Sequence, residues 1–454
     1  MMATRVSLIC GLLIFLLTAS GTQAKVTPEE AAKLGKELTP LGAIRAGNAD
    51  GTIPAWDGGI TQPPASYKPG THHPDPFIEE KPLLTITAAN AEKYRDKLSP
   101  GQLAMLRRYP KTWRMSVYPT HRSASLPQHV YDATIANATT AELARGGNGV
   151  LHAKRGIPFP IPKAGVEAVW NHLLRYIGDT VSITTGQATP TPSGAYMLLR
   201  YTEEVIFPYY SRGASDSDSD NRISFYLRTA LSPPRLAGDI LLVHDPLDQV
   251  KELRQAWTYN PGLRRVRRAP HVAYDNPGFA ADGIRTTDQH GMFNGAPDRY
   301  HWTLVGRREM YVPYNSYELH QGDLAYDDII RPGHVNPDLT RYELHRVWVV
   351  EGKLKEGTRH IYSRRTFYFD EDSWQILLAD LYDGRGEIWR TSEAHVINYY
   401  EVPLVWITLE AHYDLNNGRF TLYGIDNQED VAKFNIKLNP QNFTPNVLRQ
   451  MGRR

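Results

Sequence analysis

The sequence predicts an α+β protein whose main part is an antiparallel β-sheet with helices packed against it. Strand-like segments rich in β-branched and aromatic residues dominate the chain from about residue 190 onward. Short turn sequences join neighbouring segments of this kind, as in β-hairpins. Strands do not alternate with long helices, which argues against Rossmann-like and TIM-barrel plans.

Composition favours a turn-rich β protein over a helical bundle. The 454 residues include 35 glycines, 32 prolines, 26 tyrosines and 9 tryptophans. Lys and Arg number 51 against 49 Asp and Glu, a formal net charge of +2, and 41% of the residues are hydrophobic. This balance argues against bulk disorder and against a strongly basic nucleic-acid-binding protein.

The first 24 residues predict a secretory signal peptide. Arg5 precedes an uncharged apolar run at residues 6–19, and small or polar residues follow at 20–24. The run is shorter than the ~20 residues that a transmembrane helix needs. We therefore expect cleavage after Ala24, and a soluble, periplasmic mature protein.

Cys10 is the only cysteine of the chain, and it lies inside this leader. A lipoprotein would need the cysteine after the apolar run, so that alternative is disfavoured. Removal of the leader leaves no cysteine and also removes Arg5, so the charge balance becomes 50 against 49, a net of +1. Thiol nucleophiles, thiol redox chemistry and Cys-zinc sites are then excluded.

Residues 25–160 predict an irregular, helix-bearing N-terminal extension that packs on the sheet. A capping box with proline at the first helical position begins at Thr27 and predicts a helix to about Leu38. Further capping boxes begin at Ser99 and at Thr139. Proline-rich stretches at residues 62–64 and 72–76 interrupt any regular element.

Residues 161–454 predict the sheet domain together with one covering helix. In residues 164–178 the apolar positions recur at helical spacing. Strand-like runs follow at residues 195–201, 222–227, 239–243, 343–350 and 374–382. Hairpin turns are predicted at residues 383–386 and 416–418.

The segment from Trp374 to Tyr382 has apolar side chains on both of its faces. A strand with one face in water would alternate apolar and polar residues. Two alternatives follow. Either a second layer packs on the outer face, or one face is concave and lines a cavity.

Several blocks follow one another in a fixed order along most of the mature chain. They are LTPLGAIRAGNADGTIPAW at residues 38–56, GIPFPIP at 156–162, WNH at 170–172, REMYVPYN at 308–315, YELHRVW at 342–348 and YFDEDSW at 368–374. Together they closely resemble an exported bacterial family of unassigned function. Its members are often described as outer-membrane lipoprotein-sorting-like.

A looser resemblance lies in WTYNPGLRRVRR at residues 257–268. This segment is similar to the strand-turn-strand segment of lipoprotein-sorting carriers such as LolA and LolB. The resemblance implies a strongly curved antiparallel sheet, a half-barrel covered by helices, whose concave face holds acyl chains. Members of the family are often encoded near an exporter of the resistance-nodulation-division (RND) type and a second exported protein, which implies envelope partners and no catalytic residue.

Signatures of common enzymes are absent from the chain. It contains no Gly-x-Ser-x-Gly, no His-Glu-x-x-His, no P-loop and no dinucleotide fingerprint. We therefore expect no catalytic residue, no cofactor and no metal. An envelope hydrolase or isomerase that uses Asp, Glu and His is the least favoured alternative.

Two acidic runs are expected to be exposed to solvent and to have no catalytic or metal-binding role. Residues 216–221 resemble the start of a calcium loop, but Asn221 and Leu227 stand where an EF-hand needs Gly and a bidentate Glu. A solvated acidic loop is favoured. Residues 370–372, Asp-Glu-Asp, lie where a hairpin must turn, so exposure to water is favoured over acid-base work.

The histidines do not form a convincing metal site. His72 and His73 with Asp75 are predicted to form a surface loop, because prolines hold that segment extended. His345, His360 and His395 fall in β segments and meet only if the strand register brings them together. Three separately hydrogen-bonded histidines are favoured.

Four clustered arginines are the strongest local charge feature of the chain: Arg264, Arg265, Arg267 and Arg268. Export and the near-zero net charge oppose nucleic acid as their target. Anionic lipid headgroups or an acidic partner surface fit the compartment better. The alternative is a strand whose arginines pair with nearby Asp and Glu.

Aromatic residues are the candidates for a ligand-lined cavity: Trp257, Tyr259, Trp302, Trp348, Trp374 and Trp389. Each aromatic side chain buries roughly 150–250 Å², so packing in the core is the alternative role. We expect a periplasmic carrier or chaperone that holds a lipid-like molecule in the concave face of the sheet for an envelope export system. A non-carrying accessory subunit of an RND-type exporter is the runner-up.

Overall fold

The computed structural model describes residues 26–211, 221–269, 272 and 274–452. The predicted signal peptide with Cys10 and the acidic run at residues 216–220 lie outside the described residues. In the described part of the chain, no helix has both the length and the apolar character needed to cross a membrane.

The strands differ widely in length along the chain. In chain order they are β1 Leu84–Ile86, β2 Met115–Val117, β3 Glu142–Leu143, β4 Val150–Leu151, β5 Thr180–Ala188, β6 Leu199–Ile206, β7 Arg222–Ser232, β8 Ile240–Pro246, β9 Gln255–Asn260, β10 Arg265–Arg268, β11 Tyr300–Pro313, β12 Ile330–Arg331, β13 His334–Val335, β14 Tyr342–Leu354, β15 Arg364–Asp370, β16 Ile376–Tyr382, β17 Ile388–Tyr399, β18 Leu404–Asp414, β19 Phe420–Ile425 and β20 Lys433–Phe434.

The helices are few and short. The α-helices are α1 Pro28–Ala31, α2 Pro100–Arg108, α3 Gln128–Thr140, α4 Gly165–Leu173, α5 Tyr326–Ile329 and α6 Pro445–Met451. The 3₁₀ helices are η1 Ala91–Lys97, η2 Arg145–Gly147, η3 Thr287–Gln289, η4 Pro297–Arg299, η5 Glu318–His320 and η6 Pro440–Phe443.

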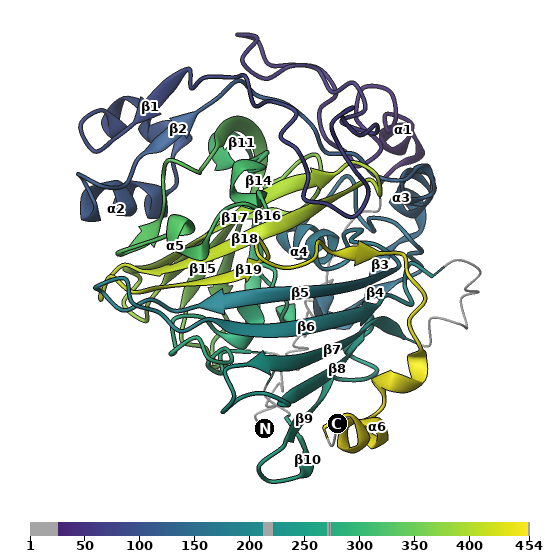
Figure 1. The fold of residues 1–454 in the computed structure, drawn as a ribbon. Coiled ribbons are helices and arrows are strands. Elements are labelled where there is room, and N and C mark those ends of the chain that lie inside the picture. The colour runs from purple at the N-terminus through teal and green to yellow at the C-terminus, as the bar shows by residue number, and fades with distance from the viewer. Residues whose placement is uncertain (1–25, 212–220, 270–271, 273, 453–454) are drawn as a thin grey trace, which may run out of the picture.

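Sixteen strands of the described residues form one large sheet (Figure 1). Its order is β1-β2-β14-β15-β16-β17-β18-β19-β5-β6-β7-β8-β9-β10, while β11 also pairs with β14 and β20 with β5. Every pairing is antiparallel except the short contact between β2 and β14. The end strands β1 and β10 do not pair with each other, so the sheet is open. This confirms the predicted fold class, a large curved antiparallel sheet with covering helices.

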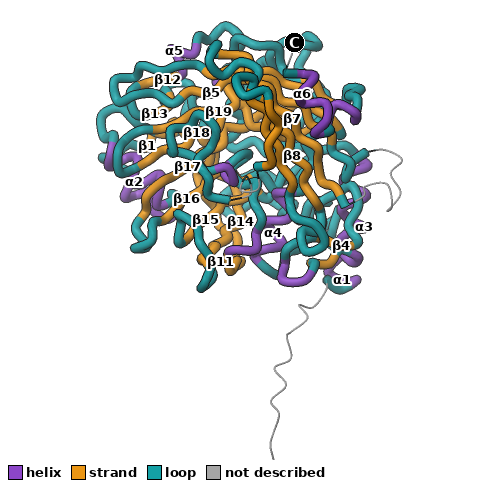
Figure 2. Tube along the Cα trace, turned by 90° about the horizontal axis from the view of Figure 1, so that it is seen from below, coloured by secondary structure: helices purple, strands orange, loops and turns teal. Residues whose placement is uncertain are grey.

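Curvature places the covering helix in the hollow of the sheet. Figure 2 shows the sheet bending from β15 and β16 round to β7 and β8, with α4 between these two parts. The predicted helix at residues 164–178 is therefore confirmed, although it ends at Leu173. Buried Asn171 holds it to the chain before it, because its side chain accepts from the Phe159 N–H at 2.9 Å and donates to the Phe159 carbonyl at 2.7 Å.

The N-terminal extension contributes β1 and β2 to the sheet, its helix α2 packs on β16 and β17, and its residues 126–159 pack with α4 in the main core. The capping box of α2 is present, with Ser99 and Gln102 as its two members. The capping box at Thr27 is also present, but α1 ends at Ala31 rather than near residue 38. Gly35 then takes a positive φ of 76° and turns the chain away from the helix. The box expected at Thr139 is wrong, because Thr139 lies in the last turn of α3 and Glu142 lies in β3.

Strand β16 is buried along its whole length, as the two-sided apolar pattern indicated. Helix α2 packs against it and against β17. On the hollow side, the imidazole Nδ1 of His172 in α4 lies 3.1 Å from the Trp374 carbonyl oxygen just before β16. For this segment the packed-layer alternative holds, since β16 is buried on both sides and only Gln375, just before it, lines the pocket described below.

The turn Asp370-Glu371-Asp372 joins β15 to β16 as expected, but its predicted exposure to water is wrong. The three residues are only 0%, 2% and 5% exposed. Arg122 from the extension binds both oxygens of Asp372 at 2.8 and 2.6 Å. Arg307 and Arg346 pair with Glu371 at 3.2 and 3.4 Å. The extension buries the turn, and arginines from distant parts of the chain compensate its charge.

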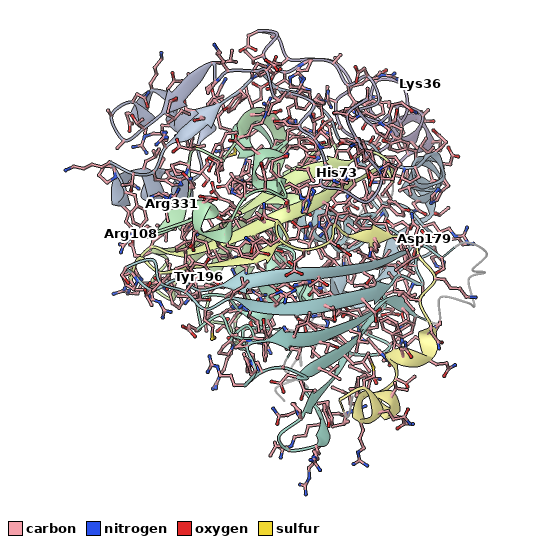
Figure 3. All side chains as sticks on the ribbon, viewed as in Figure 1. Lys36, His73, Arg108, Asp179, Tyr196 and Arg331 are labelled. Atoms are coloured by element: carbon pink, nitrogen blue, oxygen red, sulfur yellow. The ribbon has the colours of Figure 1, made fainter. Side chains whose placement is uncertain are left out.

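The predicted surface loop at His72 and His73 is also wrong for His73, which is fully buried. Its ring lies between Glu401, whose oxygens are 3.0 and 3.1 Å from Nε2, and the Nε2 of His320, 3.1 Å from Nδ1. In Figure 3, His73 lies over the centre of the molecule, whereas Lys36 of the same extension lies at its edge. The proline-rich stretch is thus a strap laid over the sheet.

Candidate functional site

A pocket of about 150 Å³ lies between the hollow face of the sheet and the segment that follows α4. Val181 and Ile183 of β5 face it together with Val205 of β6, because residues two apart on a strand share one face. The remaining apolar residues of its wall are Leu173, Ile177, Phe207, Ile223, Phe293, Val405, Trp406 and Ile407. An apolar cavity of this size in another protein stays dry and binds benzene.

One end of the pocket is polar and built around Glu203. The O–H groups of Tyr226 and Tyr423 both donate to its Oε1, the second at 2.5 Å. His290 faces the same two tyrosine rings edge-on, with centroid distances of 5.6 and 5.1 Å. Burial lowers the pKa of His290, so its ring is neutral at pH 7.

Glu410 of β18 forms a second buried carboxylate in this wall. Its oxygens accept from the Gly291 N–H at 2.9 Å and the Met292 N–H at 3.3 Å, and the His412 ring lies 3.2 Å away. Burial acts to raise the pKa of Glu410, but the hydrogen bond from His412 and nearby positive charge outweigh it, so the pKa is lowered. Glu410 is therefore an ionised carboxylate whose hydrogen bonds come from the protein.

Arg175 lies beside this carboxylate, just after α4. Its Nη1 donates to the His172 carbonyl at 2.7 Å, and its Nη2 lies against Gly291. Its Nε is buried and has no hydrogen-bond partner among the described residues. Burial lowers the pKa of Arg175 to about 10, which still leaves it charged at pH 7.

The other arginine of the pocket is paired. Arg254 binds the carboxylate of Asp245 and donates from Nη1 to the Asn294 carbonyl at 2.7 Å. Arg254 therefore fixes the loop that carries Asn294 to strand β8, and its charge is already compensated.

The six aromatic residues predicted to line a cavity do not lie in this pocket. Trp302, Trp348, Trp374 and Trp389 belong to or pack against the main core. Trp374 is fully buried and donates from Nε1 to the Leu41 carbonyl at 3.0 Å. Trp257 and Tyr259 of β9 belong to a separate apolar cluster that includes Leu448 of α6. Ligand contact by these six residues stays a prediction.

The four predicted arginines lie together on one exposed hairpin. Arg264 is in the turn between β9 and β10, and Arg265, Arg267 and Arg268 are on β10 itself. All four are exposed. Within the described ranges none of them forms an ion pair, and Arg268 lies 5.7 Å from the centre of the Trp257 ring. Their contact with an anionic headgroup or a partner stays a prediction.

The three histidines predicted in β segments lie apart in the structure, and the β segment is wrong for His360, which lies in the connection between β14 and β15. His345 of β14 is 3.1 Å from Glu343, and His360 is 3.1 Å from Asp288 in the connection before β15. His395 of β17 lies 3.5 Å from the Ser316 hydroxyl. The preference for three separate histidines is confirmed.

One group of side chains has the spacing of metal ligands. Ligand atoms of His345, Asp370 and Asp372 lie within 4.8 Å of one another. Both oxygens of Asp372, however, already accept hydrogen bonds from Arg122. The group fits an ion-pair network that ties the extension to the sheet better than a metal centre.

Sequence reasoning missed the ionisable residues of the pocket, although a signal for them exists. Arg175 interrupts the apolar run LLRYI, and Glu410 stands in the run ITLEAHY. A charged residue inside an otherwise apolar run is rarely fully buried without a partner. Such interruptions indicate a site more directly than the aromatic residues do.

The chain is similar to several known proteins. The family model described as "Protein of unknown function (DUF1329)" matches residues 85–449 of the chain. The chain belongs to this family. It is also 49% identical over 453 residues to the uncharacterized protein PA3922 of Pseudomonas aeruginosa, with 100% of each chain covered. The predicted membership of a family without assigned function is confirmed.

The chain is also similar to several solved structures. One is a putative outer membrane lipoprotein-sorting protein domain from Vibrio parahaemolyticus, which is 15% identical and has a TM-score of 0.42. The match covers 63% of this chain and 98% of that domain. A DUF1329 family protein from Desulfovibrio piger is 13% identical, with 60% and 92% covered and a TM-score of 0.41. A LolA superfamily protein, NE2245 from Nitrosomonas europaea, is 14% identical, with 62% and 98% covered and a TM-score of 0.37.

Proposed function

We propose that the protein is a periplasmic carrier that holds a hydrophobic molecule in the pocket between the curved sheet and the segment after α4. The observation that carries this proposal is the pocket itself, whose wall is mostly apolar and includes a small number of fixed polar groups. Ligand sites in proteins commonly combine these two features. The leader-like N-terminal sequence supports the compartment.

The size of the pocket limits what it holds. A volume of about 150 Å³ suits a group the size of a small aromatic ring or the first part of an alkyl chain. A longer molecule would extend through the mouth of the pocket or require side chains to move.

Filling the pocket tests this proposal. Ile223 of β7 is half-buried and lines it, so Ile223→Trp places a large side chain in the ligand space. We expect this variant to bind the fluorescent probe N-phenyl-1-naphthylamine at least 10-fold more weakly than the unaltered protein. Ile361→Trp is the matched control, because Ile361 is 37% exposed and lies outside the pocket.

Equal binding of the probe by both variants would show that the pocket does not hold it. A companion measurement is mass spectrometry of lipids extracted from protein purified from the periplasm. Protein that is reproducibly empty and also fails to bind the probe would contradict the carrier function.

The β9–β10 hairpin supports a contact with an anionic membrane surface. The hairpin lies at one end of the molecule, next to α6 (Figure 1). Its turn carries Leu263, which is 56% exposed, beside Arg264. Arginines attract anionic lipid headgroups at roughly 1 kcal/mol each, and an exposed apolar residue can insert between the lipids.

Replacing the four arginines of the hairpin with serine tests this contact. We expect the variant to lose most of its binding to vesicles that contain anionic phospholipid, and the loss to shrink as salt is raised. Unchanged vesicle binding would exclude the hairpin as a membrane contact. If crosslinking in cells instead traps a membrane protein through this hairpin, the accessory role beside an RND-type exporter is favoured.

A further inference from the structure

The pocket contains an arginine that the protein leaves unpaired. Arg175 shows no ion pair in the part of the chain that the structure describes, and its buried Nε donates no hydrogen bond there. Arginines that are removed from water almost always have an acidic partner. A cation held in this way, in the wall of a mostly apolar pocket, needs an anion from elsewhere.

The carboxylates nearby do not fill this role. Glu410 takes its hydrogen bonds from two backbone N–H groups and His412, and Glu203 takes its own from Tyr226 and Tyr423. Asp245 is paired with Arg254. Each acidic side chain of the pocket thus takes its hydrogen bonds from groups other than Arg175, and Glu410 attracts the guanidinium only through its charge.

Charged side chains lie both in the wall of the pocket and behind it. The wall carries three carboxylates, Glu203, Asp245 and Glu410, and two guanidinium groups, Arg175 and Arg254. Buried Arg228 and Arg285 lie behind the wall, where both act on His290. Of the two guanidinium groups in the wall, Arg254 is paired with Asp245, whereas Arg175 has no ion pair in the described residues.

From these observations we infer that the molecule held in the pocket carries one carboxylate, which pairs with Arg175 while its apolar part lies against β5, β6 and β18. This inference rests on the proposed carrier function and specifies its ligand class. A carboxylate would give the unpartnered Nε of Arg175 an anionic acceptor, whereas a neutral head leaves the guanidinium without an ion pair. Charge-assisted hydrogen bonds between a guanidinium and a carboxylate are also strong and directional.

Calorimetric titration with decanoate and with 1-decanol tests the inference, because the two probes differ only in their heads. We expect the unaltered protein at pH 8 to bind decanoate about 10- to 100-fold more tightly than 1-decanol, the usual gain from hydrogen bonds to a charged group. Arg175→Gln should remove that preference and leave binding of 1-decanol within about 3-fold. Arg175→Lys keeps the charge and should retain part of the preference.

Two controls keep the outcome clear. Arg385→Gln changes an arginine whose side chain is 83% exposed in a hairpin turn, and it should keep the full preference. Titrating the unaltered protein at pH 4 needs no variant, and partial protonation of the decanoate, whose pKa is near that of Glu at about 4–5, should reduce the preference several-fold. This arm decides the question even if Arg175→Gln does not fold.

The failures of the two proposals are distinguishable. If the unaltered protein binds both probes equally, or if Arg175→Gln keeps the preference, the carboxylate is excluded while the carrier function stands. If neither decanoate, 1-decanol nor N-phenyl-1-naphthylamine binds, the carrier function falls and the inference falls with it.

Discussion

Buried carboxyl groups in the centre of the sheet are the residues most sensitive to pH. The Tyr342 O–H lies 3.2 and 3.1 Å from the two carboxyl oxygens of Glu393 on β17, and burial raises the pKa of Glu393 to about 7. Burial also raises the pKa of Asp380 on β16 to about 6. Between pH 4.5 and 7 the folded protein therefore binds protons at these groups that the unfolded chain releases.

The sign of the pH dependence follows from that difference in bound protons. The contribution of Glu393 to the free energy of unfolding falls as pH rises from about 4.5 to 7. Glu393→Gln keeps the shape and stays neutral, so we expect it to be more stable than the unaltered protein at pH 8, by up to about 3 kcal/mol, and nearly equal at pH 4.5. Urea unfolding at both values of pH measures the difference. A stability difference that does not change with pH would contradict the raised pKa.

At the scale of elements, the docking of α2 on the sheet depends on a close approach of backbone to side chain. The Gly101 N–H donates to Asp380 Oδ1 at 3.1 Å, and the Ser99 hydroxyl donates to the same oxygen at 3.2 Å. The Asp380 carboxyl thus lies at the N-terminus of α2, where the helix dipole favours negative charge. A Cβ at position 101 would collide with Asp380 and Thr391.

Gly101→Ala should therefore destabilise the protein by about 1–3 kcal/mol, the usual cost of overpacking. Gly384→Ala is the control, since nothing lies within 4 Å of a Cβ there. Thermal unfolding followed by circular dichroism compares the two variants. If both have the same melting temperature, the extension is not anchored through this contact.

At the scale of the whole molecule, the extension and the sheet form one structure. Strands β1 and β2 of the extension continue the large sheet, and its strap places His73 beside Glu401 and His320. Arg122 of the extension helps to bury the turn at residues 370–372 through its ion pair with Asp372. The extension thus packs both on the sheet and against α4, while α4 and the segment after it line the pocket on the hollow side of the sheet.

Local patterns predicted several elements of the fold, although they misplaced the end of α1 and the helix start expected at Thr139. Hairpin turns at residues 383–386 and 416–418 do join β16 to β17 and β18 to β19. Apolar spacing predicted α4, and the capping box predicted the start of α2. Each of these features is determined by residues that are close together in the sequence, so the pattern can be read directly.

The errors about burial arise from contacts between residues that are far apart in the sequence. Asp372 pairs with Arg122, 250 positions away, and His73 contacts His320, 247 positions away. Polar residues in a proline-rich segment or a hairpin turn look exposed until such partners are known. The pocket was missed for the same reason, since residues of β5, β18 and the loop at Gly291 meet only in the folded sheet.

The open sheet has a consequence at its last strand, β10. Its outer edge carries unpaired backbone N–H and C=O groups, which in many proteins recruit a strand from another copy and lead to aggregation. Three exposed arginines on this short strand place like charges wherever two such edges would meet. Repulsion between these like charges opposes pairing of two copies through this edge. The serine variant of this hairpin removes that protection, so its vesicle binding has to be compared with its light scattering in the absence of lipid.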